Sequence, residues 1–209
     1  MCSSDLQWSL VVAGGGPAGF MAAIAAAERG LRRVLVLEST PEPLGKVLIS
    51  GGGRCNVTHA CWDPRDLVGA YPRGGQALRG PFSRFAAGDA VAWFDAHGLE
   101  LVEEADGRLF PRSNRSSSVI ACLRGAAQRA GVELRTQLAL AAATALPAGG
   151  FALQLRGGQQ LRCDRLVLAT GSHPSGRRLA EGLGHGLVPP VPSLFRSEEH
   201  TSELQSPCN

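Results

Sequence analysis

The first forty residues alternate between apolar runs and glycine-rich or polar breaks. Residues 9–13 form a short apolar run that ends in glycines, which predicts a buried strand. Residues 17–29 are rich in alanine and stop before Gly30, as helices commonly do. Residues 33–38, RVLVLE, form a second run of β-forming residues. Two strands joined by one helix predict a parallel pair with a right-handed crossover.

The middle of the chain has a weaker pattern. Residues 39–71 are rich in glycine, proline and polar residues and predict a long loop, which in a compact domain is usually functional or disordered. Apolar residues at helical spacing predict helices at 89–97 and 116–130, and the serines that open the second helix are candidate N-caps. Residues 132–136 predict the next strand.

The last third of the chain predicts antiparallel pairing followed by one more buried strand. Residues 151–156 and 160–163 alternate around two glycines, which predicts a hairpin. Residues 165–169, RLVLA, predict a final buried strand, and the proline-rich residues 172–195 predict a loop. The whole pattern predicts an α/β fold of the Rossmann type, with a parallel sheet and a small antiparallel meander.

Composition agrees with a globular protein. The chain has 209 residues, of which 44% are apolar, and a formal net charge of +3. No apolar run approaches the roughly 18 residues that a membrane-spanning helix needs, and the N-terminal residues do not resemble a secretory signal. Six cysteines spread along the chain do not resemble a disulfide framework. We therefore expect a cytoplasmic protein without a membrane partner.

Two features stand out against this composition. Lys46 is the only lysine among 21 basic residues, so its chemistry is of interest. Residues 196–209, RSEEHTSELQSPCN, are polar throughout and resemble a translated sequencing adapter. We expect that these residues are not native and that residues 1–195 are the N-terminal part of a larger FAD-binding domain. An ordinary disordered polar tail is the alternative.

A first glycine-rich motif directly follows the first predicted strand. The sequence GGGPAG, which begins at Gly14, fits the G-x-G-x-x-G pattern of dinucleotide-binding proteins. Gly14 would allow a tight turn, Gly16 would let a pyrophosphate approach the backbone, and Gly19 would let the helix pack on the strand. The helix that begins at Pro17 and Ala18 would offer its partial positive charge to the phosphates.

An acidic residue completes this motif. Glu38 ends the second predicted strand, 24 residues after Gly14, where its carboxylate can accept the hydroxyl protons of an adenosine ribose. A carboxylate at this position argues against the 2′-phosphate of NADP. The motif does not separate FAD from NAD, and a glycine-rich turn of another α/β fold is the structural alternative.

A second glycine-rich element favours FAD. Residues 45–56 read GKVLISGGGRCN, whereas a nicotinamide-binding Rossmann domain normally begins its second helix here. Three consecutive glycines can lie flat against a ligand or form a nest of N–H groups. Lys46 or Arg54 could stabilise negative charge on a reduced flavin, or bind only a phosphate or a loop carboxylate. The candidate contacts are Lys46, Ser50, Gly52, Arg54, Cys55 and Asn56; a flexible loop is the alternative.

The third element is the sequence LVLATG, which ends at Thr170 and Gly171. A βαβ unit, a small antiparallel meander and a strand that ends in ATG follow the order found in flavoproteins of the two-dinucleotide-binding type. In these proteins the ATG turn returns the chain to the cofactor. We therefore expect Thr170 and Gly171 to contact FAD.

Together these segments resemble a known family. VVAGGGPAG, GKVLISGGGRCNVT, GRLFPRSNRSSSVI and LVLATG occur in the same order in the BaiN-like flavoproteins, also described as NAD(P)/FAD-dependent oxidoreductases or aminoacetone oxidase family FAD-binding enzymes. The resemblance covers residues 8–195, and SGGGRCN is its most specific part. It implies a protein about twice this length, with an inserted substrate domain and a returning C-terminal strand. The loop at 171–174 departs from the family pattern, so substrate residues are not inferred from it.

Other kinds of site are less well supported. Cys55, His59 and Cys61 lack a fourth ligand and match no usual zinc spacing, so we expect no metal. A redox disulfide between the two cysteines is disfavoured by their separation. Arginines in the middle of the chain raise the question of RNA, but no series of aromatic residues for base stacking accompanies them, and we expect no nucleic-acid partner.

The sequence thus predicts an FAD-dependent oxidoreductase. It would transfer a hydride between FAD and a nicotinamide cofactor or a small organic substrate, with NAD(P)H as a candidate electron donor. The substrate and the catalytic residues stay unassigned. The alternatives are an NAD-dependent Rossmann dehydrogenase and a truncated product without catalytic activity.

Overall fold

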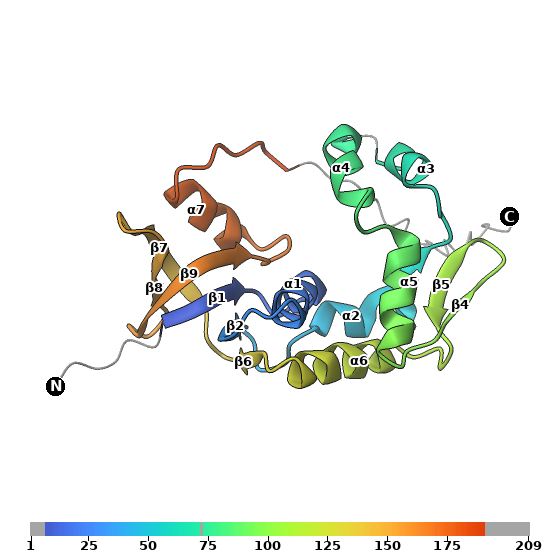
Figure 1. The fold of residues 1–209 in the computed structure, drawn as a ribbon, viewed down its shortest axis with the longest axis horizontal. Coiled ribbons are helices and arrows are strands. Elements are labelled where there is room, and N and C mark those ends of the chain that lie inside the picture. Colours follow the sequence, from blue (N-terminus) through green and yellow to red (C-terminus); the bar gives the residue numbers. More distant parts are fainter. Residues whose placement is uncertain (1–6, 72, 191–209) are drawn as a thin grey trace, which may run out of the picture.

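A computed structural model describes residues 7–71 and 73–190 (Figure 1). The expected non-native tail, 196–209, lies outside these residues. The centre of the fold is a six-stranded sheet in the order β6-β2-β1-β9-β8-β7. Its strands are β1 (Gln7–Ala13), β2 (Val34–Leu37), β6 (Glu133–Arg135), β7 (Leu140–Ala145), β8 (Phe151–Leu155) and β9 (Gln160–Leu168).

Half of this sheet is parallel and half is antiparallel, as the sequence predicts. β1 pairs in parallel with β2 on one side and with β9 on the other, and β2 pairs in parallel with β6. β7, β8 and β9 form the antiparallel meander. The two strands expected at 160–163 and 165–169 are one continuous strand, β9, because the same strand pairs with β8 and with β1.

Helix α1 (Pro17–Glu28) follows β1 and covers one face of the sheet. Leu10 and Val12 of β1 pack with Ala23 of α1 on that face, whereas Val11 and Ala13 pack toward β8 and α7 (Pro174–Gly182) on the other. β1 is therefore buried on both faces, which is why its sequence is an unbroken apolar run rather than an alternating one. The βαβ prediction for this part of the chain is confirmed.

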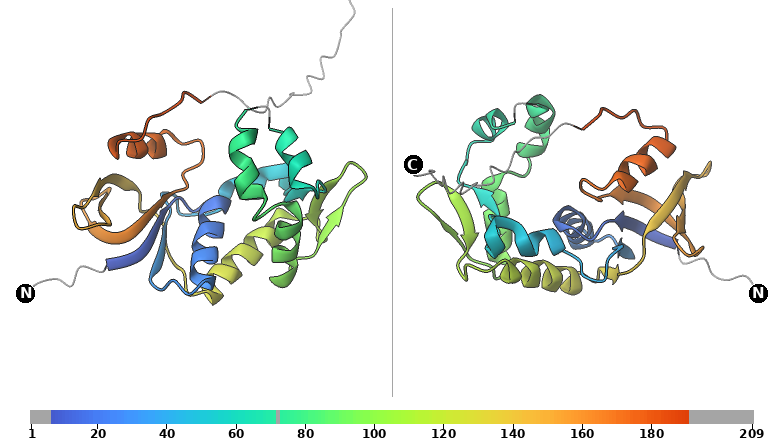
Figure 2. Two further views of the ribbon diagram at one scale, coloured as in Figure 1. Left: turned by 45° about the horizontal axis from the view of Figure 1, so that its top comes forward. Right: turned by 180° about the vertical axis from the view of Figure 1, so that it is seen from behind.

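A second region lies beyond α1. A small antiparallel sheet has the order β3-β5-β4, and its strands are β3 (Thr58–His59), β4 (Leu101–Glu103) and β5 (Arg108–Pro111). The remaining helices are α2 (Gly45–Ile49), the 3₁₀ turn η1 (Ser50–Gly53), α3 (Pro64–Gly69), α4 (Gly75–Phe82), α5 (Ala87–Ala96) and α6 (Ser116–Arg129). α6 packs along α1 through a shared apolar cluster that includes Phe20, Ile24, Val119 and Leu123. Figure 2 shows α3, α4 and α7 on the side of the molecule opposite α6.

Two expected loops contain helices. Residues 39–71 include α2, η1, β3 and α3, each of six residues or fewer, so none is long enough to show a repeating pattern of apolar positions. Residues 172–195 were expected to form a loop, but α7 occupies Pro174–Gly182. Its first turn holds a proline, where the missing N–H costs nothing, and His173 Nδ1 accepts a hydrogen bond from the Ser175 N–H at 3.2 Å.

The expected serine cap of α6 is also wrong. The N-cap is Arg115, which makes no side-chain capping bond. Ser116 lies inside the helix, is 2% exposed, and donates its hydroxyl to the Leu48 carbonyl at 2.8 Å. The serine therefore joins α6 to α2 instead of capping its own helix.

No helix in the described part of the chain is long and apolar enough to cross a membrane.

Candidate functional site

The turn between β1 and α1 forms a cradle whose glycines have different surroundings. Gly14 has a φ of +119°, and a Cβ there would lie 2.4 Å from the Ala169 carbonyl oxygen at the end of β9. A Cβ on Gly19 would lie 1.9 Å from the Gly14 carbonyl oxygen, whereas a Cβ on Gly16 would meet no atom within 4 Å. The turn and the close packing expected of Gly14 and Gly19 are present. Gly16 is open, as an approaching pyrophosphate requires.

The N-terminus of α1 has no internal partner for its charge. Gly16 is the N-cap and makes no side-chain capping bond, and the first turn holds no acidic residue. Pro17 has no N–H, so the free donors begin at Ala18. An anion placed over Gly16 would meet these N–H groups and the positive end of the helix. The cradle therefore fits the diphosphate of a dinucleotide.

Glu38 lies at the rim of this cradle. Its Oε2 accepts a hydrogen bond from the Gly15 N–H at 2.8 Å, and its Oε1 accepts from the Thr40 N–H at 2.7 Å and the Thr40 hydroxyl at 2.8 Å. Ser39 adds a hydroxyl donor at 3.2 Å. Partial burial raises the pKa of Glu38, but the bonds from Thr40, Gly15 and Ser39 outweigh it and leave the pKa below its ordinary value. The carboxylate is therefore ionised near neutral pH and held in place by these donors, and its contact with a ribose stays a prediction.

Lys46 joins the second glycine-rich element to the ATG turn that follows β9. Its Nζ donates a hydrogen bond to the Ser172 hydroxyl at 3.1 Å, and a Cβ on Gly171 would lie 3.7 Å from that nitrogen. Thr170 packs on α7, because a Cβ on Gly176 would lie 2.0 Å from its hydroxyl oxygen. The only lysine of the chain thus lies beside the ATG turn, exposed and close to the end of β9. Sequence reasoning missed Ser172, since nothing in the local pattern pairs it with residue 46.

The triglycine segment forms a left-handed turn. Gly51, Gly52 and Gly53 have φ values of 55°, 66° and 84°, a region where side chains are strained. The Ser50 hydroxyl donates to the Val47 carbonyl at 2.9 Å, and the Cys55 N–H donates to the Ser50 carbonyl at 3.0 Å. The Ser50 hydroxyl and carbonyl therefore both stabilise the turn, and a contact of Ser50 with the cofactor stays a prediction. A Cβ on Gly52 would meet nothing within 4 Å, which leaves this part of the turn open to one.

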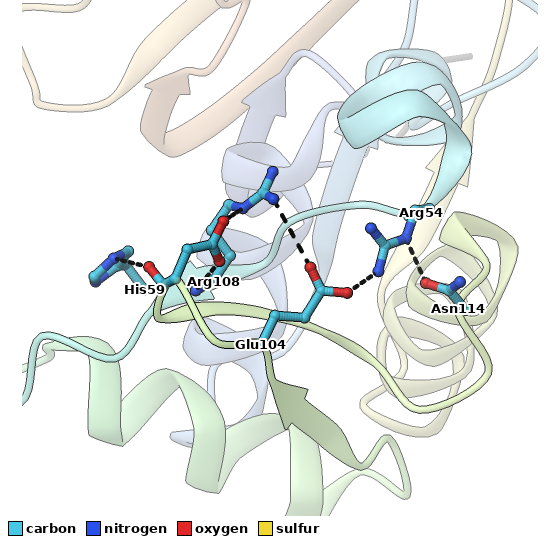
Figure 3. A network of polar contacts seen from close by, with 6 residues as sticks. Arg54, His59, Glu104, Arg108 and Asn114 are labelled. Carbon is cyan, nitrogen blue, oxygen red and sulfur yellow. Dashed lines mark hydrogen bonds and ion pairs between the residues drawn. The ribbon is translucent and has the colours of Figure 1, made fainter.

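Arg54 is bound to the small sheet (Figure 3). Its Nε donates to Asn114 Oδ1 at 2.5 Å, its Nη2 pairs with Glu104, and its guanidinium lies 4.0 Å from the centre of the Phe110 ring. Glu104 also contacts Arg108 at 3.8 Å. Of the two roles left open for Arg54, binding to a loop carboxylate is the one the structure shows. Lys46 is then the better candidate for a cation beside the flavin.

The last two residues of the segment differ in exposure. Cys55 is 7% exposed and packs in the apolar cluster with Leu44 and Val47, which makes its thiol part of the core. Asn56 is exposed. Cys55 and Cys61 are free thiols, and no three His, Cys, Asp or Glu side chains converge within the described residues.

A cavity of about 350 Å³ lies elsewhere, between α7 and β7. Its lining includes Leu140, Arg156, Arg178 and Leu179, and no residue of the glycine cradle. The cavity is therefore not part of the expected cofactor site.

The parallel sheet, the open glycine cradle, the uncapped helix and the acid at the end of β2 define a Rossmann-type dinucleotide-binding domain. The chain matches the family model of the HI0933-like protein Rossmann domain over residues 8–192, and it belongs to this family. It is also 34% identical over 194 residues to the 3-dehydro-bile acid delta(4,6)-reductase of Clostridium scindens, which covers 88% of this chain and 46% of the relative. The resemblance to BaiN-like flavoproteins is thereby confirmed.

A second curated relative has a different printed activity. The ribosomal RNA dihydrouridine synthase of Escherichia coli is 29% identical over 207 residues, which covers 95% of this chain and 50% of the relative. The chain therefore spans about half the length of the curated relatives it matches. One relative is named as a reductase and the other as a dihydrouridine synthase.

Solved structures share the fold. The THI4 protein of Thermovibrio ammonificans has a TM-score of 0.59 at 16% identity and covers 88% of this chain and 65% of its own. A 3-ketosteroid-delta4-(5alpha)-dehydrogenase of Rhodococcus jostii RHA1 has a TM-score of 0.60 at 20% identity and covers 82% and 47%. At these identities the likeness is one of architecture.

Proposed function

We propose that this chain is the FAD-binding part of a reductase that acts on a carbon–carbon double bond conjugated to a carbonyl group. The observation that carries the proposal is the open cradle at Gly16, with the ionised Glu38 at its rim and Lys46 beside the ATG turn. The proposal includes the expectation that residues 1–195 are the N-terminal part of a longer protein, which the length of the relatives supports.

The substrate chemistry is inferred from what the two curated relatives have in common. One is named as a delta(4,6)-reductase of a 3-dehydro-bile acid, and the other forms dihydrouridine in ribosomal RNA. In both products two hydrogens have been added across a double bond that is conjugated to a carbonyl group. Bound FAD, once reduced by an electron donor such as NADH or NADPH, would supply a hydride for such an addition, and a proton from water or a protein group would complete it.

The residues of this chain would bind and orient the cofactor. The N-terminus of α1 and Gly16 would hold the pyrophosphate, and Glu38 would accept hydrogen bonds from the adenosine ribose. Lys46, Gly52, Thr170 and Gly171 would lie toward the flavin. Lys46 would place a positive charge where a reduced flavin carries negative charge, with Ser172 holding its amine.

The reaction is tested with the FAD-loaded protein, reduced beforehand in the absence of oxygen. We expect a conjugated enone to reoxidise the flavin, measured by recovery of its visible absorbance, and an isolated alkene of the same carbon skeleton to leave it reduced. Equal rates with the two compounds, or no reoxidation by either, would contradict the proposed substrate class. Reduction by NADH or NADPH in the same cell tests the expected nicotinamide donor.

A second candidate substrate is a base in RNA. The Escherichia coli relative acts on ribosomal RNA, and the segment 61–86 of this chain presents four exposed arginines together with exposed aromatic rings. The fold does not test the expectation that the protein has no nucleic-acid partner. It also does not test the expected cytoplasmic location. The surface of segment 61–86 is therefore the feature of this chain that favours RNA as a substrate.

A further inference from the structure

Within residues 61–71 and 73–86, α3 and α4 form a helical hairpin that projects on the same side of the molecule as α7 (Figures 1 and 2). Neither helix contains a buried residue. The two helices pack on one another, because a Cβ on Gly75 would lie 3.0 Å from the Val68 carbonyl oxygen and the Tyr71 and Phe82 rings are 5.5 Å apart. This helical hairpin therefore adds little to the core of the protein.

The charge of the helical hairpin is positive. It contains four arginines and two aspartates, which is most of the chain's net charge of +3 within 26 residues. All four arginines are exposed: Arg65, Arg73, Arg79 and Arg84. Asp63 caps α3 and pairs with Arg65 at 2.7 Å, so one of the two acids is already occupied within the hairpin. The outer surface is therefore suited to a polyanion.

Aromatic rings are exposed in the same segment. Trp62, Tyr71 and Phe85 are 53%, 44% and 45% exposed, and they are the only exposed Trp, Tyr or Phe side chains in the described part of the chain. The aliphatic residues Leu67 and Leu78 are less exposed. A membrane-binding helix would expose aliphatic residues along with the rings. The helical hairpin instead exposes arginines and rings together.

We propose that the helical hairpin binds single-stranded RNA, with the arginines on the phosphates and the aromatic rings stacked on bases. Proteins that bind single strands combine a basic surface with such rings, since every base has a face that can stack. Arginine also binds phosphate through two parallel hydrogen bonds. This inference rests on the RNA candidate of the proposed function and gives it a binding surface. Sequence reasoning missed it because the rings follow no regular spacing.

The test measures the affinity of the purified 209-residue chain for a fluorescein-labelled oligouridylate by fluorescence anisotropy, at about 50 to about 200 mM salt. We expect the triple variant Arg73→Gln/Arg79→Gln/Arg84→Gln to lower the slope of log affinity against log salt by about 2, since each lost phosphate contact removes about 0.7. The matched control is Arg32→Gln/Arg124→Gln/Arg156→Gln, which removes the same charge from exposed arginines elsewhere. The decrease in slope should be less than half as large in the control variant as in the hairpin variant.

A second variant separates stacking from charge. Trp62→Ala should lower the affinity about tenfold while leaving the salt slope unchanged, because stacking on a base releases no counterions. Circular dichroism checks that each variant folds; the substituted side chains are all exposed.

The inference would be overturned if the oligouridylate did not bind, or if the two triple variants lost the same slope. Binding of heparin and of double-stranded RNA as tight as that of the oligouridylate would also overturn it, as would a dimer or a lipid-vesicle complex formed through Trp62 without RNA binding. The experiment needs no flavin turnover. A chain that binds FAD but not RNA refutes only this surface, and a chain that binds RNA but not FAD refutes only the proposed reductase.

Discussion

At the scale of single residues, the cradle separates glycines that the fold needs from a glycine that a ligand needs. Gly14 and Gly19 are in close contact with backbone atoms of the same cradle and of β9, so any side chain there would displace the chain. Gly16 faces open space. One motif therefore contains both structural and binding positions, and substitution can tell them apart.

We expect Gly19→Ala to lower the free energy of unfolding by about 1–3 kcal/mol, because the new methyl group would overlap the Gly14 carbonyl. Gly16→Val should leave stability within about 0.5 kcal/mol and abolish FAD binding. Urea denaturation and FAD titration measure the two effects, with Gly186→Val as a control for a valine at another open glycine. FAD binding that survives Gly16→Val would contradict the assignment of the pyrophosphate site.

Glu38 gives a prediction for pH. The pKa of Glu38 in the folded chain lies below its ordinary value, so the folded chain binds this proton at a lower pH than the unfolded chain does. The stability that Glu38 adds over Glu38→Gln is therefore present above the pKa of Glu38 in the unfolded chain and is lost as pH falls through its folded-state pKa. Urea denaturation of both chains at a series of pH values measures this, and Glu42→Gln serves as the control. A difference that grows toward acid pH would refute the role of these hydrogen bonds.

Sequence reasoning located Glu38 and Lys46 but not their partners. The acid follows from its place at the end of a strand, and Lys46 from its rarity and its motif. Ser39, Thr40 and Ser172 were missed, because their roles depend on the directions of single hydroxyl groups. The ion-pair partner of Arg54 could also be found only from the structure, since Glu104 is fifty residues away along the chain.

At the scale of elements, length decided what the sequence could predict. α1 and α6 have two or more turns of apolar positions and were predicted within one residue of their ends. α2, α3 and the strands of the small sheet are too short to show a period. The triglycine run was predicted as an unusual backbone and forms a left-handed turn, but only the structure shows that it is fastened to β5 through Arg54.

That fastening predicts a coupling between elements. Arg54 and Glu104 are 33% and 35% exposed and are flanked by Phe110, whereas Arg112 and Glu100 are 67% and 54% exposed. Arg112 lowers the pKa of Glu100, yet solvent screens so exposed a pair. Double-mutant cycles with glutamine, followed by urea denaturation, should give a coupling energy of about 1 kcal/mol for Arg54–Glu104 and a smaller one for Arg112–Glu100. The reverse order would show that Arg54 does not hold the small sheet to the turn.

At the scale of the whole molecule, the parallel strands followed from their apolar runs and the β8–β9 hairpin from its alternating pattern, whereas β7 (Leu140–Ala145), the third strand of the meander, was not predicted. The small sheet did not follow from the sequence, since β3 pairs with β5 from a distant part of the chain, and the helical hairpin did not, since its helices are too short to show a period. The chain spans about half the length of its curated relatives, and we propose that a further segment of the kind that makes up the rest of those relatives closes the FAD site. We therefore expect this chain to bind FAD reversibly and to lose it during purification.

The central claim is that the cradle belongs to an FAD-binding domain rather than to an NAD-dependent dehydrogenase. Equilibrium titration of the purified chain with FAD and with NAD⁺, each followed by protein fluorescence, tests it most directly. We expect saturable binding of FAD that Gly16→Val removes, and NAD⁺ binding that is at least tenfold weaker. Tighter binding of NAD⁺ than of FAD, or FAD binding that is unchanged in Gly16→Val, would contradict it.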